Sequence, residues 1–263
     1  PMLGKAKTSA KVEVDFRGSG TTYSLFRIRH VYFNLDWGKS ALLVGQTWHP
    51  LYGDVAPEIL NLNMGAPYQP FSRAPQIRYR FTSNNFMLTA AAIWQSQYLS
   101  VGPKTNKPGE TSTQKSQEFM KKSCVPEFYL GVDYKRPGLI AGAGLHVSSI
   151  TPRTQSETED AVYFANERVT GISGEAHVKY TKENWLVSAK TVLGTNLTQT
   201  STVGGYGITS IDEVTGKQQY SPLRTSSTWV NVAYGKKWRP ALFFGYLKNL
   251  GATKEVPYGA LGT

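Results

Sequence analysis

The chain has 263 residues and carries 29 Lys and Arg against 18 Asp and Glu, which gives a formal net charge of +11. Its single cysteine, Cys124, excludes an intramolecular disulfide and a cysteine-based metal site. No segment approaches the roughly 20 consecutive apolar residues of a transmembrane helix, so a helical membrane protein is excluded. The basic residues are spread singly rather than clustered, which weakens a nucleic-acid-binding interpretation of the charge.

Apolar and polar residues alternate with period two along most of the chain, which indicates β-strands. The first alternating segment is 10–16, and five hairpins follow at about 23–48, 76–98, 125–149, 170–193 and 227–248. Short polar segments typical of tight turns join the strands of each hairpin, near 38–40, 83–85, 136–138, 181–184 and 235–239. The sequence therefore predicts an all-β, antiparallel single domain over 1–263 with about eleven strands.

Four long polar segments separate the hairpins, at about 49–75, 99–123, 150–168 and 194–226. Loops of this length are uncommon in a compact soluble domain. Transmembrane β-barrels combine short turns at one rim with long loops at the other. The alternation of short and long connections therefore predicts a transmembrane β-barrel with short periplasmic turns and long extracellular loops.

Aromatic residues gather at the strand ends that lie next to the predicted turns. In outer-membrane barrels such residues form a girdle at the level of the lipid headgroups. Eight residues fit this position: Trp37, Phe81, Phe86, Tyr134, Tyr180, Trp185, Tyr234 and Trp238. Their common place beside one rim supports the membrane interpretation.

The segments "FRIRHVYFNLDWGKSALLVGQTWHPL" (26–51), "NMGAPYQPFSRAPQIRYRF" (63–81) and "LTAAAIWQSQY" (88–98) resemble the outer-membrane porins of Bacteroides-type bacteria. The blocks "GQTWHPL" and "GAPYQPFSRAPQ" carry the resemblance, and the rest of the chain fits in rhythm only. The resemblance implies a passive diffusion channel for small hydrophilic solutes in the outer membrane of a Gram-negative bacterium. It also implies a homotrimer or membership of a larger outer-membrane assembly.

Two features depart from that family. About eleven strands is an odd number and falls short of a closed porin. The final residues "EVPYGALGT" lack the aromatic-ended strand expected of such barrels. We therefore expect an incomplete barrel.

Strand parity divides the side chains into a lipid-facing set and a pore-lining set, because apolar residues face outward and polar residues face the lumen. The residues expected to face lipid are Ile77, Tyr79, Phe81, Phe128, Leu130, Val132, Val178, Val230 and Val232. The residues expected to line the pore are Gln76, Arg78, Arg80, Glu127, Asp133, Glu175, His177 and Lys179. A shift of one residue in register would invert a whole strand.

Arg27 and Arg29 have the parity of lipid-facing residues, and an arginine near the middle of the membrane costs about 2–4 kcal/mol. We therefore expect a β-bulge near Arg29 or His30, or a position covered by protein. Together with Arg78 and Arg80, these residues would form a ladder that favours anions. The alternative is an ordinary solvated lumen whose charge is balanced by Glu13, Asp15 and Asp36.

The segment 49–75 is too apolar and too rich in proline for a solvated rim loop. We expect it to fold into the lumen as a constriction, where Arg73 faces Asp54 and Glu58. The alternative is a loop that packs at a subunit interface. Three arginines against two carboxylates predict a mild anion preference. The arginines are Arg73, Arg78 and Arg80, and the carboxylates are those of Asp54 and Glu58.

Enzymatic chemistry has little support. The four histidines show no metal-ligand spacing, and His146 and Ser148 form no nucleophile–base arrangement beyond a chance pairing. We expect neither an enzyme nor a cofactor, and as partners membrane lipid and small solutes rather than nucleic acid. Two other functions stay open: a non-channel structural or adhesion barrel that presents long surface loops, and a soluble β-sheet binding module.

Overall fold

The computed structural model describes residues 2–3, 5–16, 25–58 and 65–262 of the chain. One antiparallel sheet dominates it, and successive long strands pair with their neighbours in chain order. The eleven long strands are β2 (Ala6–Asp15), β3 (Arg27–Asp36), β4 (Ser40–Trp48), β5 (Arg73–Ser83), β6 (Phe86–Ile93), β9 (Glu127–Arg136), β10 (Leu139–Ile150), β13 (Val169–Lys182), β14 (Trp185–Thr195), β16 (Gln218–Tyr234) and β17 (Ala241–Ala252). A meander of this kind is the simplest antiparallel order, because each tight turn places the next strand beside the last.

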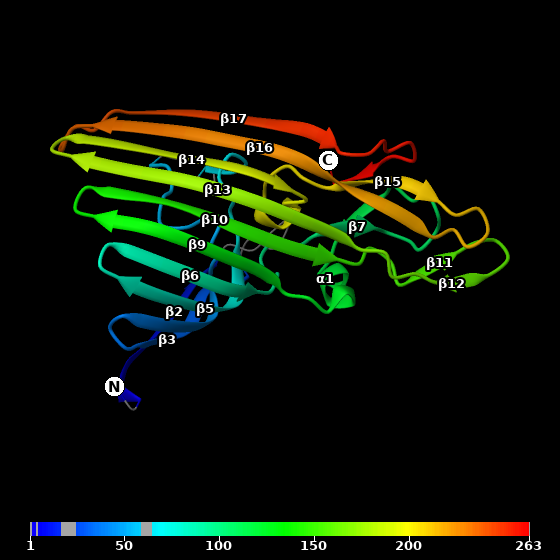
Figure 1. The fold of residues 1–263 in the computed structure, drawn as a ribbon, viewed down its shortest axis with the longest axis horizontal. Helices are drawn as coiled ribbons and strands as arrows, with labels where there is room; N and C mark the ends of the chain where they lie inside the picture. The colour runs from blue at the N-terminus through cyan, green and yellow to red at the C-terminus, as the bar shows by residue number, and fades with distance from the viewer. Residues whose placement is uncertain (1, 4, 17–24, 59–64, 263) are drawn as a thin grey trace.

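The five tight connections lie together at one end of the sheet, and the long connections lie at the other end (Figure 1). Residues in left-handed conformation make the turns, such as Asn84 at φ 52° and Gly138 at φ 76°. The first is tolerated because asparagine adopts positive φ more readily than most residues, and the second because glycine has no Cβ. The predicted rhythm of short turns and long loops is thus present.

The long connections carry short elements of their own. They are β7 (Val101–Pro103), β8 (Thr113–Lys115), α1 (Glu118–Ser123), β11 (Gln155–Glu157), β12 (Val162–Phe164), η2 (Thr198–Thr200), β15 (Tyr206–Ile211) and β18 (Ala260–Leu261), while β1 (Met2–Leu3) pairs with β2. The fourth predicted loop, 194–226, was too long, because β16 already begins at Gln218 and pairs there with β15. No helix among the described residues has the length and apolar character that a membrane span requires.

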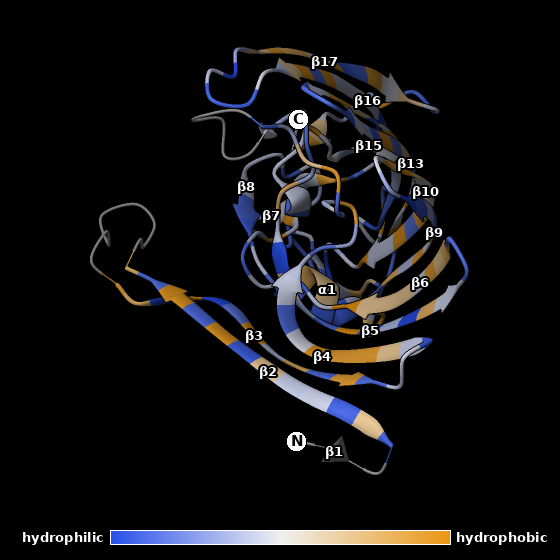
Figure 2. Ribbon diagram, turned by 90° about the vertical axis from the view of Figure 1, so that its left-hand side faces the viewer, coloured by the Kyte–Doolittle hydropathy of each residue, from blue (hydrophilic) through white to orange (hydrophobic). Residues whose placement is uncertain are grey.

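The sheet curls around an interior into which the long connections fold (Figure 2). Apolar side chains point away from this interior along β5, β9, β10, β13 and β14, where Ile77, Phe128, Leu130, Leu145, Ile172 and Leu193 are 49–62% exposed. Polar side chains of the same strands are buried on the inner face. This arrangement inverts a soluble β-sandwich and agrees with the lipid-facing set predicted from strand parity.

The inner face packs against the inserted connections through two apolar clusters. The first joins the loop residue Leu51 to Tyr129 of β9 and Val192 of β14. The second joins Phe119 of α1 to Ile150 of β10, and also contains Tyr206 of β15. The connections are therefore held inside the curved sheet rather than extended away from it.

Over the described residues, β17 pairs with β16 alone among the strands, and β2 pairs with β1 and β3. The two ends of the sheet are therefore not joined to each other by strand pairing, and the sheet is open along this seam. Closure into a complete barrel is not observed in the described part of the chain, which agrees with the incomplete barrel expected from the odd number of strands.

Candidate functional site

The segment Leu51–Glu58 runs across the inner face of the sheet. The Lys190 ammonium of β14 donates to the backbone oxygens of Leu51 and Tyr52, at 2.9 and 2.8 Å. Further along, the Glu58 backbone N–H donates to Asn231 Oδ1 of β16 at 2.8 Å. Two inner-wall side chains thus hold the outgoing limb of the loop by its backbone.

The returning limb is held as firmly, by β16. Trp229 Nε1 donates to Gln69 Oε1 at 2.7 Å, and Ser227 Oγ donates to the Tyr68 backbone oxygen at 2.6 Å. Gln69 Nε2 in turn donates to the Tyr52 backbone oxygen at 2.8 Å, which ties the two limbs together. The described parts of 49–75 therefore lie inside the curved sheet, and residues 59–64 lie outside the described residues.

Both loop carboxylates are neutralised by basic residues that lie toward the turn end of the sheet. Each carboxylate lies between two cations, so its negative charge is cancelled and the group of three side chains keeps a net charge of +1. The pairs are Asp54 with Lys135 at 2.5 Å and Arg80 at 3.9 Å, and Glu58 with Arg239 at 2.7 Å and Lys179 at 3.6 Å. We expected Asp54 and Glu58 to face Arg73, but the structure pairs both carboxylates with other basic residues. Arg73 is the first residue of β5, at the loop end of the sheet, whereas the loop carries the carboxylates farther toward the turn end.

Arg73 and Arg78 differ from the other basic residues of this wall. Their side chains are 3% and 8% exposed, and no described carboxylate lies within salt-bridge distance of either guanidinium. Arg73 stacks on the Trp48 ring, with 3.8 Å from Cζ to the ring centroid, while its Nε lacks a hydrogen-bond partner among the described residues. Arg78 donates to Gln76 Oε1 at 2.9 Å and to the Trp48 backbone oxygen. Two positive charges near the loop entry thus stay uncompensated.

Arg27 and Arg29, by contrast, are compensated. Arg27 makes two hydrogen bonds to Asp15, at 2.9 and 2.6 Å, and Arg29 binds Glu13 at 2.6 Å and Asp15 at 3.1 Å. The pairing of β2 with β3 shifts between Glu13 and Val14, and Arg29 is the extra residue on β3. The predicted bulge is confirmed, and it turns the parity of this strand so that both arginines leave the apolar face.

A second charged cluster joins β9, β13 and β14. The His177 ring lies between two carboxylates, with Nδ1 at 3.0 Å from Glu175 Oε2 and Nε2 at 2.8 Å from Asp133 Oδ1. Tyr129 donates to the other oxygen of Glu175 at 2.9 Å, and the Lys190 ammonium lies 3.9 Å from that carboxylate. The cluster thus joins two carboxylates to the His177 ring and to the lysine that holds the loop.

A third cluster brings together His49, Glu127 and His146, whose candidate ligand atoms lie within 4.8 Å of one another. The Leu51 backbone N–H donates to His49 Nδ1 at 3.2 Å, so the proton of this neutral ring sits on Nε2 and is donated to Glu127. His146 Nε2 and Gln95 Nε2 complete the shell of Glu127, at 2.8 and 2.7 Å. Without a metal ion, the cluster is a hydrogen-bond network that ties the loop entry to β9 and β10.

The structure places the predicted pore-lining residues on the inner face at two depths. Buried side chains lie farther from the turns, and half-buried ones lie nearer to them. The buried set comprises Gln76, Arg78, Glu127, Glu175 and His177, and the half-buried set comprises Arg80, Asp133 and Lys179. Whether they line a conducting pore stays a prediction.

Sequence reasoning missed Lys190, Asn231 and Trp229, which hold the loop. Lys190 and Asn231 are polar and have the inward parity of their strands, so the rule that selected Glu175 and His177 would have selected them as well. Trp229 shares the parity of Asn231, but it is apolar, and the rule gives no signal for it. The histidine–glutamate network had no local signal, because its members lie 19 and 78 residues apart.

The predicted aromatic girdle lies beside the turns. Seven of its members face outward, and Tyr134 is half-buried. Rings on neighbouring strands meet in pairs, Phe86 with Tyr134 at 5.1 Å and Trp185 with Tyr234 at 4.6 Å between centroids. This row marks one border of the apolar outer face.

No protein-family profile and no curated protein sequence matches the chain. Among solved structures, it is similar to OmpF of Salmonella typhi in complex with daunomycin, at 15% identity over 97% of this chain and 72% of that one, with a TM-score of 0.59. OmpT, an outer membrane protein of Vibrio cholerae, matches in its loop L8 deletion form at 15% identity over 97% and 83% of the chains, with a TM-score of 0.47. A trimer form of OmpT matches at 13% identity over 98% and 84%, with a TM-score of 0.44.

These similarities concern the fold. The 14-stranded antiparallel sheet, the near absence of helix and the match to OmpF agree with one another. The chain has the fold of outer-membrane β-barrel proteins.

Proposed function

We propose that this protein is an outer-membrane porin of a Gram-negative bacterium, a passive channel for small hydrophilic solutes whose constriction is the loop 49–75. One observation carries the proposal: the sheet turns apolar side chains outward and charged side chains inward, and the loop crosses the charged inner face. Water in a lumen would solvate that inner face, while lipid would cover the outer one. Assembly as a homo-oligomer belongs to the proposal through the sequence resemblance.

The soluble alternative conflicts with the outer face. Soluble monomers rarely expose contiguous apolar patches larger than a few hundred Å². Here exposed apolar residues follow one another across six neighbouring strands, from Ile77 of β5 to Leu193 of β14. Lipid contact explains such a surface without any partner protein.

The alternative of a non-channel barrel is favoured by the filling of the interior. Leu51 and Val55 of the loop have no exposed surface, and Trp229 and Lys190 beneath them are equally covered. A loop packed this closely could close the lumen rather than narrow it. Conductance therefore decides between the two functions.

The channel is proposed to prefer anions mildly, because Arg73 and Arg78 keep uncompensated charges whereas Arg80 is paired with Asp54. A unit charge about 7 Å from a passing ion contributes about 0.6 kcal/mol in bulk water, close to RT. Each of the two arginines should therefore change the local ion population about two- to threefold.

Planar-bilayer recordings under a potassium chloride gradient test both points. Wild-type protein should conduct, and its reversal potential should be shifted toward the equilibrium potential of chloride. The double variant Arg73→Gln, Arg78→Gln should shift that potential toward potassium, and Arg80→Gln should shift it less. Arg136→Gln at the exposed turn end is the matched control and should leave it unchanged. A folded protein without conductance would refute the channel, and an unshifted potential in the double variant would refute the role of these arginines.

A further inference from the structure

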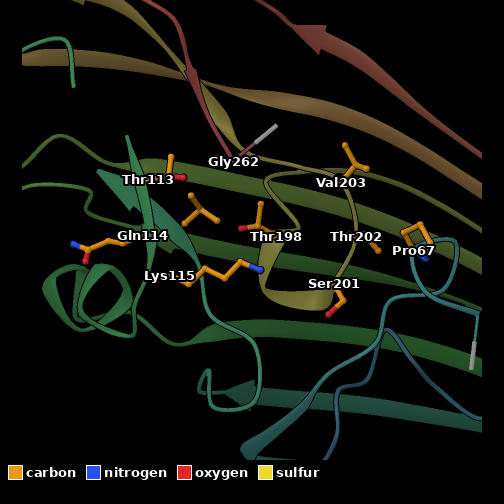
Figure 3. A pocket seen from close by; sticks show the side chains of 10 residues that line it. Pro67, Thr113, Gln114, Lys115, Thr198, Ser201, Thr202, Val203 and Gly262 are labelled. Atoms are coloured by element: carbon orange, nitrogen blue, oxygen red, sulfur yellow. The ribbon is translucent and has the colours of Figure 1, made fainter. Parts of the chain in front are cut away.

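A cavity of about 660 Å³ lies among the long connections, at the loop end of the interior (Figure 3). Its wall comes from four parts of the chain that are distant in sequence: Pro67 of the loop 49–75, the β7–β8 hairpin, the segment from η2 to Val203, and Gly262. The volume falls within the range of small-molecule sites. It borders the proposed constriction, because the Phe71 backbone N–H donates to the Thr200 backbone oxygen at 2.7 Å.

Two hydroxyl groups in this wall lack hydrogen-bond partners among the described residues. Thr198 is 7% exposed and its Oγ1 is unpaired, and Ser201 Oγ is unpaired as well. The neighbouring hydroxyls of Thr200 and Thr202 are instead taken up by the Leu197 backbone oxygen, at 2.8 and 3.0 Å. Buried polar groups without partners are rare in folded proteins, so unpaired hydroxyls beside a cavity indicate that its occupant supplies the partners.

The wall also has one basic residue. The Lys115 side chain extends along the cavity toward Thr198 (Figure 3). No salt bridge holds its ammonium in the part of the chain that the structure describes, whereas the next lysine, Lys121, is paired with Glu118 at 2.8 Å. Gln114, also in the wall, donates to the Pro103 backbone oxygen at 3.2 Å and leaves its amide oxygen as an acceptor.

We propose that this cavity binds a hydroxyl-rich solute with one anionic group, of the sugar-acid class. The carboxylate or phosphate pairs with Lys115, and the hydroxyls bond Thr198, Ser201 and Gln114. The Lys115 charge alone would attract any anion, and the wall hydroxyls alone would bind any sugar. A site that has both therefore favours a solute that carries both an anionic group and hydroxyl groups. The site lies where a solute would wait before the constriction, and only this last role rests on the proposed function.

Equilibrium dialysis of the full chain in detergent tests the site without any need for conductance. Glucuronate is the probe, with glucose and acetate as the two partial ligands. Glucuronate should bind saturably, and about tenfold more tightly than either partial ligand. Lys115→Gln should reduce glucuronate binding to the level of glucose, whereas Lys104→Gln in the same hairpin, outside the cavity wall, should not change it.

Thr198→Val should weaken glucuronate and glucose alike, and Thr198→Ser, which keeps the hydroxyl, should restore both. Absence of saturable glucuronate binding, acetate binding equal to glucuronate, or unchanged binding in Lys115→Gln would each overturn the proposal. A protein that binds glucuronate but does not conduct would refute the porin function alone. A protein that conducts without binding would refute this site alone.

Discussion

Tyr129 shows how a single side chain can join three strands. Gly131 of β9 pairs with Gly144 of β10, and the Tyr129 ring lies over both glycines on the inner face. A Cβ at Gly144 would lie 2.3 Å from the Tyr129 hydroxyl oxygen. The ring can therefore lie flat on the sheet and reach Glu175 of β13 with its hydroxyl only because neither glycine carries a side chain.

Gly144→Ala should destabilise the fold by about 1–3 kcal/mol, because the new methyl group forces the buried Tyr129 ring out of place. Urea unfolding in detergent, followed by tryptophan fluorescence, measures the loss. Gly174→Ala is the matched control on the neighbouring strand, since its nearest atom would be Leu145 Cδ2 at 3.8 Å. Equal effects of the two substitutions would contradict this account of Tyr129.

At the residue scale, sequence reasoning succeeded where the physics is local. The cost of an arginine in lipid predicted the bulge at Arg29. A short segment of sequence is enough for this prediction, because it shows both the parity of the strand and the charged residue on the wrong face. It failed for Asp54, whose partners Lys135 and Arg80 depend on how deeply the loop enters the interior. Loop depth is set by packing between distant segments, which no local pattern encodes.

At the scale of elements, the loop 49–75 depends on a small number of wall residues. Lys190 is buried and donates two hydrogen bonds to the loop backbone while it also lies near Glu175. Its removal leaves two buried carbonyl groups and part of a carboxylate charge without compensation. Each such group costs about 1–3 kcal/mol.

Lys190→Met should therefore detach the outgoing limb of the loop while the strands stay paired. Limited proteolysis should cut within 49–75 sooner than in the wild type, and single-channel conductance should rise because the constriction widens. Lys182→Met, an exposed lysine on the adjacent strand β13, is the control and should change neither property. Identical cleavage of Lys190→Met and wild type would show that the loop is held by other contacts.

The hairpins were predictable because each one carries its own turn signal and its own alternation. The five predicted turns coincide with the short connections of the structure. The extension of β16 to Gln218 was not predictable in this way, since it requires β15 as a partner. The same holds for β7 with β8 and for β11 with β12, short pairs that form only within folded connections.

At the scale of the whole molecule, the outer face distinguishes a membrane barrel from a soluble sheet. Val132 lies four residues before Arg136 at the turn end of β9, which places it about 13 Å along the strand. That is about half the height of the roughly 25 Å apolar band of an outer-membrane barrel. Phe86 lies beside the turn and belongs to the aromatic girdle, where its ring meets Tyr134.

Lysine at these two positions should give different results in lipid. Val132→Lys should destabilise the protein by about 2–4 kcal/mol and Phe86→Lys by about 0–1 kcal/mol, because the cost of a charge falls toward the membrane interface. Reversible urea unfolding in lipid vesicles measures both values. In a water-exposed sheet the loss of stability would not depend on the position of the lysine along the strand. Val132→Lys would then cost little, because the side chain already meets solvent. A depth-independent pair of values would therefore reject the membrane barrel itself, together with every function proposed for its interior.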